Sequence, residues 1–222
     1  MIGTDALLDR IASSLGGAAP PDQDPTGHAI LDATLDTIAA VGLAGLSLDA
    51  IARRASCNRT TIYRRFTDRD GLLVALAERE AHRMADELRR SIEGATDPAE
   101  LLCEAFVTSV RLAIAHPLVA RARQHEPEAL LAALAFDGSR VLRIGGAAVG
   151  AALRHAASQG SPSPVDPDAA GLAAARLLAS FLLTPGPDLD VNDPADVRRY
   201  AQEVLTPLLL GHRAGGAGEE AR

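Results

Sequence analysis

Apolar residues recur at intervals of three and four along most of this chain, and nowhere do they alternate with polar residues over the length of a strand. The first clear stripe contains Ile30, Leu31, Leu35 and Ile38, which share one face of a helix with 3.6 residues per turn. Prolines and glycines divide the remainder into further helical segments. The pattern predicts an all-α protein.

A very short break between two of these helices is the most specific local feature. Ser47 can cap a first helix that buries Leu48 and Ile51. Only Ser56-Cys57-Asn58 separates it from a second helix over residues 59–66, which Asn58 can cap. Two helices joined by so short a turn form a helix-turn-helix pattern.

The second helix has the side chains that a reader of the DNA major groove requires. Ile62 and Phe66 face inward, so six polar residues face outward: Arg59, Thr60, Thr61, Tyr63, Arg64 and Arg65. Arginine can bind guanine through two hydrogen bonds, and threonine can contact phosphate or a thymine methyl group.

The predicted DNA contacts divide by position into two groups. We expect bases to be read by Arg59, Thr60, Thr61 and Arg64. We expect phosphates to be held by Tyr63, Arg65, Arg69 and Ser47, and the last two also begin helices, where backbone N–H groups favour anions.

The charge of the chain agrees with a local nucleic-acid site only. The net charge is −7, which argues against a nucleic-acid coat over the whole protein. Residues 47–70 are the exception, with six arginines and three aspartates. On charge alone, a solvated helix surface would explain this window equally well.

The segment from Leu46 to Leu73 resembles the DNA-binding domain of the TetR/AcrR family of transcriptional regulators. The specific part is Thr61-Ile62-Tyr63-Arg64-Arg65-Phe66 followed by Arg69-Asp70-Gly71-Leu72-Leu73. Three positions depart from the usual pattern: Ser56 replaces a frequent glycine, Arg65 a histidine and Arg69 a lysine. With the helix before it, the resemblance covers residues 26–75.

The resemblance implies a division into two domains. Residues 26–75 form the helix-turn-helix DNA-binding domain, and its fourth helix continues to about residue 92 as a connector. Residues 93–211 form a helical ligand-binding and dimerisation domain. Residues 1–25 are expected to be a flexible arm, and residues 212–222 a disordered tail.

The family typically dimerises through its last two helices. Residues 169–183 are apolar nearly all round, and the helix over 194–210 has one apolar side with Val197, Tyr200, Ala201, Val204, Leu205 and Leu208. Two such helices and their symmetry mates would form a four-helix bundle. Packing within a single chain is the alternative.

An effector pocket is predicted from helix positions that mix apolar and polar groups. The candidates are Phe106, Ser109, Val110, Ala113, Phe136, Arg140, Ile144 and Phe181. Aromatic residues make up only 3% of the chain and tryptophan is absent, which disfavours stacking on planar cations. We expect an apolar or acyl-like effector, with Arg140 or Arg111 available for a carboxylate. Ordinary core packing is the competing interpretation of these positions.

The implied function is that of a ligand-responsive repressor. A homodimer would bind a palindromic operator, and an effector would release it by shifting the short helix from Pro117 to Gln124 against the fourth helix. An activator and a regulator that senses nothing remain alternatives. An all-helical enzyme has the least support, because the six histidines lack metal-ligand spacing and no nucleophile motif occurs. We expect no cofactor and no metal.

Location is predicted from what the sequence lacks. Cys57 and Cys103 are too few and too far apart for a disulfide framework. No apolar run is long enough to span a bilayer, and the acidic N-terminus does not resemble a signal peptide. We expect a cytoplasmic protein without a membrane partner.

Overall fold

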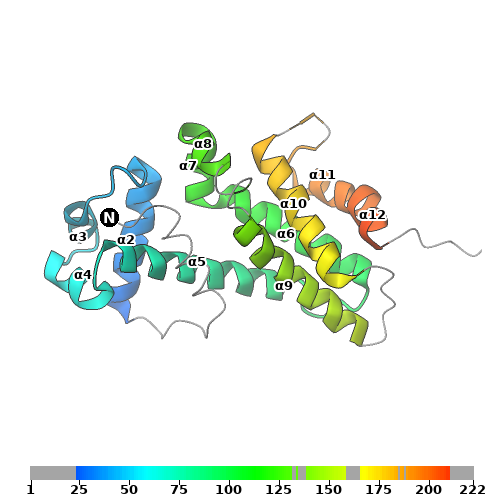
Figure 1. Cartoon of the computed structure of the whole chain (residues 1–222), viewed down its shortest axis with the longest axis horizontal. Coiled ribbons are helices and arrows are strands. Elements are labelled where there is room, and N and C mark those ends of the chain that lie inside the picture. The colour runs from blue at the N-terminus through cyan, green and yellow to red at the C-terminus, as the bar shows by residue number, and fades with distance from the viewer. Residues whose placement is uncertain are drawn as a thin grey trace, which may run out of the picture. The chain divides into compact units, whose positions relative to one another are not determined.

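The computed structural model describes residues 24–131, 134, 139–158, 166–184, 186–187 and 189–210, and the regular elements in this part are all helical (Figure 1). In chain order they are α2 (Pro25–Val41), α3 (Leu48–Arg54), α4 (Arg59–Phe66), α5 (Arg69–Ser91), α6 (Pro98–Ala115), α7 (Pro117–His125), α8 (Pro127–Leu131), α9 (Ser139–Ser158), α10 (Pro167–Leu183), α11 (Pro194–Tyr200), the π-helical turn η2 (Ala201–Leu205) and α12 (Thr206–Leu210). The all-α prediction is confirmed. The predicted tail and nearly all of the predicted arm lie outside the described residues.

The chain forms two compact units. The first contains the chain up to Glu87 together with Leu112–Val141, and the second combines Leu88–Arg111 with the chain from Leu142 onward. These units differ from the predicted domains, because α7 packs on α2 and therefore belongs with the N-terminal helices. The functional division at residues 75–93 stays a prediction.

The first unit is built around the stripes expected from the sequence. Ile30 and Leu31 of α2, Ile51 of α3, Ile62 of α4 and Leu72 of α5 are buried together in one apolar cluster. Because each helix contributes only one face, the opposite faces of α3 and α4 remain available to a partner.

Caps and turns fix where these helices begin and end. The Asp24 carboxylate accepts a hydrogen bond from the Gly27 N–H at 2.9 Å at the start of α2. Asn58 does the same for Thr61 at the start of α4, as predicted, at 2.8 Å. Ser47 occupies the capping position of α3 but its side chain makes no capping hydrogen bond, so this prediction holds for position only.

Two residues other than glycine adopt a positive φ in this region. Ser56 has φ 52°, the left-handed conformation that a glycine would adopt without strain. Thr67 follows the last residue of α4 with φ 64° and ψ −60°. The Asp68 N–H donates to the Phe66 carbonyl across it at 2.6 Å, which closes a γ-turn, and Asp68 then caps α5 through the Gly71 N–H.

In the second unit, α9 and α10 approach at glycines. A Cβ atom placed on Gly171 would lie 2.1 Å from the carbonyl oxygen of Gly146, and one on Gly150 would lie 3.0 Å from the carbonyl oxygen of Pro167. Only glycine permits backbones this close. Arg198 of α11 forms an ion pair with Glu104 of α6, with Nη2 to Oε2 at 3.0 Å.

The last helix differs from the prediction of one uninterrupted helix over 194–210. Between α11 and α12 the chain widens into the π-helical turn Ala201–Leu205, where the Thr206 N–H donates to the Ala201 carbonyl, five residues back. Pro207 explains the change, since it has no N–H to donate to Glu203 and its ring crowds that carbonyl. Among the described helices, no single one is long and apolar enough to cross a membrane.

Candidate nucleic-acid interface

The helix α4 presents a polar face from an apolar anchor. Ile62 and Phe66 are buried in the core of the first unit. Thr60, Tyr63 and Arg64 are exposed on the other side, and Tyr63 keeps 41% of its surface accessible. A tyrosine this exposed on a helix that is otherwise well packed is suited to a contact with a partner.

Arg59 begins α4 and is already oriented by protein groups. Its Nη1 lies 3.5 Å from the Asp49 carboxylate of α3, and its Nη2 donates to the Tyr63 hydroxyl at 3.4 Å. The hydrogen bond with Tyr63 and the charge of Asp49 raise the pKa of Arg59. The three side chains form one exposed cluster on the predicted DNA face.

Two other predicted phosphate ligands are engaged within the protein. Arg65 pairs with Asp24 at 2.5 Å, and Arg69 donates to the Leu43 carbonyl at 2.8 Å. Arg64 is different: among the described residues it makes no hydrogen bond or ion pair, and it is exposed. Of the arginines of α4, Arg64 is therefore the one with its donors free.

The remaining predicted contacts also lie on this unit. Ser47 is exposed at the start of α3, with its hydroxyl not used as a cap. The Thr61 hydroxyl donates to Asn58 at 3.0 Å, so in the free protein this side chain supports the cap. The structure thus gathers all eight predicted DNA-binding residues on α3, α4 and the start of α5.

Sequence reasoning missed the acids that hold these arginines. Asp24 and Asp49 precede Arg65 and Arg59 by 41 and 10 residues. The Asp24-Pro25 pair, typical of a helix start, was a usable signal for the cap but not for the ion pair. Arg53, exposed in the last turn of α3, is a further cation on this unit that the prediction left out.

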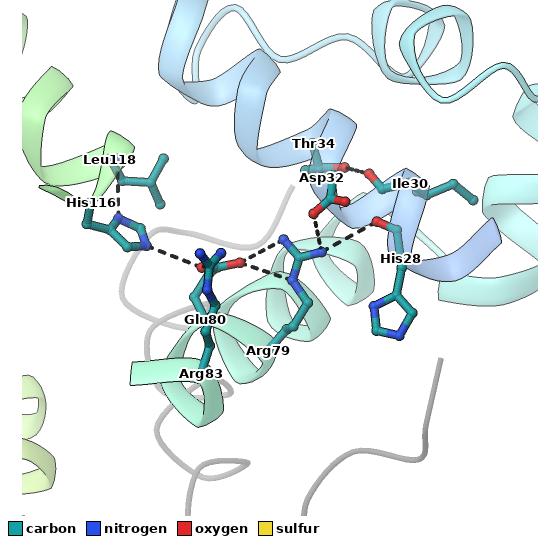
Figure 2. Close-up of polar contacts among 9 residues, drawn as sticks. All are labelled: His28, Ile30, Asp32, Thr34, Arg79, Glu80, Arg83, His116 and Leu118. Atoms are coloured by element: carbon teal, nitrogen blue, oxygen red, sulfur yellow. Dashed lines mark hydrogen bonds and ion pairs between the residues drawn. The ribbon is translucent and has the colours of Figure 1, made fainter. Parts of the chain in front are cut away.

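A buried carboxylate connects α5 to α7 within the first unit (Figure 2). Glu80 accepts hydrogen bonds from Arg79 at 2.7 and 3.0 Å, and His116 Nε2 lies 3.7 Å from its other oxygen. His116 Nδ1 also accepts from the Leu118 N–H at 3.3 Å and so caps α7. Burial raises the pKa of Glu80, but the nearby His116 and Arg79 lower it by more, so the group stays ionised at neutral pH.

A second polar contact joins α7 to the end of α2. Arg121 donates to the carbonyls of Ala39 and Ala40 at 3.3 and 2.9 Å, and Glu126 holds its Nε at 3.1 Å. A cation at the C-terminal end of a helix is favourable because the last carbonyls lack partners within the helix. No residue of α7 is fully buried, so this helix is held largely by polar contacts and by Leu118, which packs on the core.

The predicted effector residues are not brought together as one site. In the second unit Phe106 is buried and packs against Phe181 and Tyr200, with ring centroids 6.4 Å from each. Val110 is buried and Ser109 partly buried on the same helix, while Ala113 is buried in the first unit. Phe136 and the side chains of Arg140 and Ile144 lie outside the described part. Tyr200 is an aromatic neighbour that sequence reasoning did not include.

No cluster of three or more potential metal ligands occurs among the described residues. Cys103 is buried against Arg198, and burial raises the pKa of its thiol.

Comparisons with known proteins decide what the helix-turn-helix belongs to. Residues 30–76 match the family model described as bacterial regulatory proteins, tetR family. The chain belongs to the TetR family of transcriptional regulators. Its DNA-binding helix-turn-helix makes this TetR-family chain a transcriptional regulator rather than an enzyme.

Longer matches agree with this assignment. An uncharacterized HTH-type transcriptional regulator of Mycobacterium tuberculosis is 28% identical over 187 residues, which are 84% of this chain and 89% of the relative. A TetR-family regulator of Rhodococcus sp. has a similar fold with a TM-score of 0.61 at 19% identity, covering 84% of this chain and 100% of that one. The regulator FadR of Bacillus subtilis, solved with stearoyl-CoA, gives 0.55 at 20% identity, covering 83% and 98%.

Proposed function

We propose that this TetR-family regulator is a repressor that binds a palindromic operator as a homodimer and is released by a small-molecule effector. The observation that carries the proposal is α4, which is anchored by Ile62 and Phe66 and directs Thr60, Tyr63 and Arg64 to solvent. Two such helices on a two-fold axis would read half-sites about one turn of DNA apart. The protein would act where the chromosome lies, in the cytoplasm.

Dimerisation through the last two helices is supported by apolar side chains that the single chain leaves exposed. Val197, Ala201 and Leu205 fill the core of the second unit. Val204 and Leu208, on another face of the same helix, keep 43% and 65% of their surface accessible. These two residues are one turn apart and would pack against the same helices of a second copy.

Release by an effector requires an element that both sites can influence, and α7 suits this role. It is held to the first unit by the Glu80–His116 and Arg121 contacts. The chain before it, α6, begins in the second unit and ends in the first. An effector that favours a different position of α7 would weaken DNA binding, and DNA would weaken effector binding by the same factor.

An acyl group is the effector class that we would test first. The described side chains around Phe106, Phe181 and Tyr200 are apolar with one phenol hydroxyl, and FadR of Bacillus subtilis accommodates stearoyl-CoA in the same fold. Stearoyl-CoA would be titrated into the protein–DNA complex with coenzyme A alone as the control. Release by the acyl form only supports this proposal, and no release by either contradicts it.

The operator is found by selecting fragments of genomic DNA that bind the purified protein at physiological salt. We expect enrichment of a palindrome, which Tyr63→Ala and Arg64→Ala abolish. Arg176→Ala removes an exposed arginine of the second unit and serves as the control that keeps enrichment. Enrichment that survives both α4 substitutions would overturn the assignment of α4 as the reading helix.

The alternatives differ in what happens after binding. A reporter gene placed behind the enriched palindrome falls in expression if the protein is a repressor and rises if it is an activator. A regulator that senses nothing would bind the same palindrome, but no ligand would change its affinity.

A further inference from the structure

Arg65 is held differently from the other arginines at the DNA face. Its side chain is only 24% exposed, and its Nη2 donates to Asp24 Oδ2 at 2.5 Å. Its Nε is fully buried and has no hydrogen-bond partner among the described residues. Arg64, the neighbouring residue, is exposed and makes no polar contact in the described part.

Asp24 has two separate partners, one on each carboxylate oxygen. Oδ1 accepts the N–H of Gly27 and so caps α2, while Oδ2 accepts from Arg65 in the last turn of α4. The carboxylate therefore joins the first turn of one helix to the last turn of another, 41 residues further along the chain. The Gly27 N–H and Arg65 both lower the pKa of Asp24, so the pair is ionised at neutral pH.

We infer that Arg65 is an internal brace and not a phosphate ligand, and that Asp24 is the residue that positions the recognition helix α4 through it. The inference rests on the proposed DNA binding and corrects the expected role of Arg65.

The need for a brace follows from how α4 is packed. This helix has eight residues, and its two buried anchors lie on one face, four residues apart. Such anchors keep the helix on the core but leave its rotation about its own axis weakly fixed. The Arg65–Asp24 pair is a third contact away from that face. Reading a base edge requires donors held to within a fraction of an ångström, so loss of the pair affects recognition more than folding.

The competing role for Arg65 predicts the opposite effect. If Arg65 left Asp24 for a DNA phosphate, then Asp24 would compete with the operator, and its removal would strengthen binding. Each phosphate neutralised also steepens the dependence of affinity on salt by about 0.9 in logarithmic slope. The two roles are therefore separated by the sign of one substitution.

Asp24→Asn is the decisive variant, because an asparagine caps a helix as well as an aspartate does but carries no charge. Asp36→Asn is the matched control: it removes the same charge from α2, where Asp36 only faces exposed Arg54 at 3.5 Å. Affinity would be measured for the enriched palindrome and for an unrelated duplex of equal length over a salt series.

We expect Asp24→Asn to weaken palindrome binding by about three- to tenfold, since partly exposed charge pairs are modest in strength. Binding to the unrelated duplex should stay unchanged, and Asp36→Asn should weaken neither. Arg65→Gln should match Asp24→Asn and keep the wild-type salt slope. The double variant Asp24→Asn with Arg65→Gln should be no weaker than Arg65→Gln alone.

Tighter palindrome binding by Asp24→Asn, or equal behaviour of Asp24→Asn and Asp36→Asn, would overturn the inference. A wild-type protein that binds the palindrome and the unrelated duplex equally would instead overturn the proposed function. Amide hydrogen exchange of the free protein gives a readout that needs no DNA. The brace predicts that α4 amides exchange about three- to tenfold faster in Asp24→Asn than in Asp36→Asn, and equal exchange contradicts it.

Discussion

Substitution of Glu80 by alanine tests how the first unit is held together. The Glu80 side chain is only 9% exposed, with Arg79 hydrogen-bonded to one oxygen and His116 Nε2 3.7 Å from the other. The substitution leaves Arg79 with Asp32, 2.7 Å away on α2, but leaves His116 without this carboxylate (Figure 2).

The magnitude follows from what remains after the change. Breaking a buried ion pair costs about 3–5 kcal/mol when the remaining charge has no other partner. Because Arg79 keeps Asp32, we expect Glu80→Ala to lower the free energy of unfolding by about 2–3 kcal/mol. Chemical denaturation at pH 7 measures it. Glu78→Ala, on the same helix with the same change of charge, should cost less than about 0.5 kcal/mol.

The pH dependence gives an independent check with a defined sign. The pKa of Glu80 in the folded protein lies below its ordinary value of 4.5. Its contribution to stability is therefore complete above that pH and is lost as the pH falls through the folded pKa. The difference between the wild type and Glu80→Gln should shrink as the pH is lowered below 4.5. Equal stability of Glu80→Ala and Glu78→Ala at pH 7 would refute the reasoning.

Three further predictions concern backbone strain, helix packing and assembly. Ser56→Gly should raise the free energy of unfolding by about 0.5–1 kcal/mol, because φ 52° strains serine more than glycine; a loss of stability in denaturation would contradict this. Gly171→Ala should destabilise the protein by more than about 2 kcal/mol, since its Cβ would meet the Gly146 carbonyl. Gly145→Ala on α9 has open space and should be neutral or stabilising in the same assay. Leu208→Asp should convert a dimer to monomers in sedimentation without changing the helical circular dichroism, because Leu208 is exposed in the single chain; a persistent dimer would exclude this surface.

Local chemistry explains why so much of the reading unit could be predicted. The spacing of Ile62 and Phe66, the cap at Asn58 and the cap at Asp68 each involve residues within four positions of one another. Interactions over such distances depend on the helix period and on the residue types, both of which the sequence displays. The outward face of α4 followed directly from them.

The effector residues were predicted less well for a related reason. Helical spacing identifies an apolar face but not what lies opposite it. Phe106 therefore fitted a pocket wall and a core position equally, and in the structure it packs with Phe181 and Tyr200.

Only the tertiary structure decided how the predicted parts hold one another. It paired Arg65 with Asp24 across 41 residues, joined Arg121 to the end of α2 across 81 and placed α7 in the first unit. It also placed the π-helical turn before Pro207. By itself the sequence determined the helices, their caps and the side chains that face outward from α4, because these depend on neighbours along the chain. Which arginine is free to meet DNA and which is already bound depends on groups that only folding brings together, and no periodicity records that.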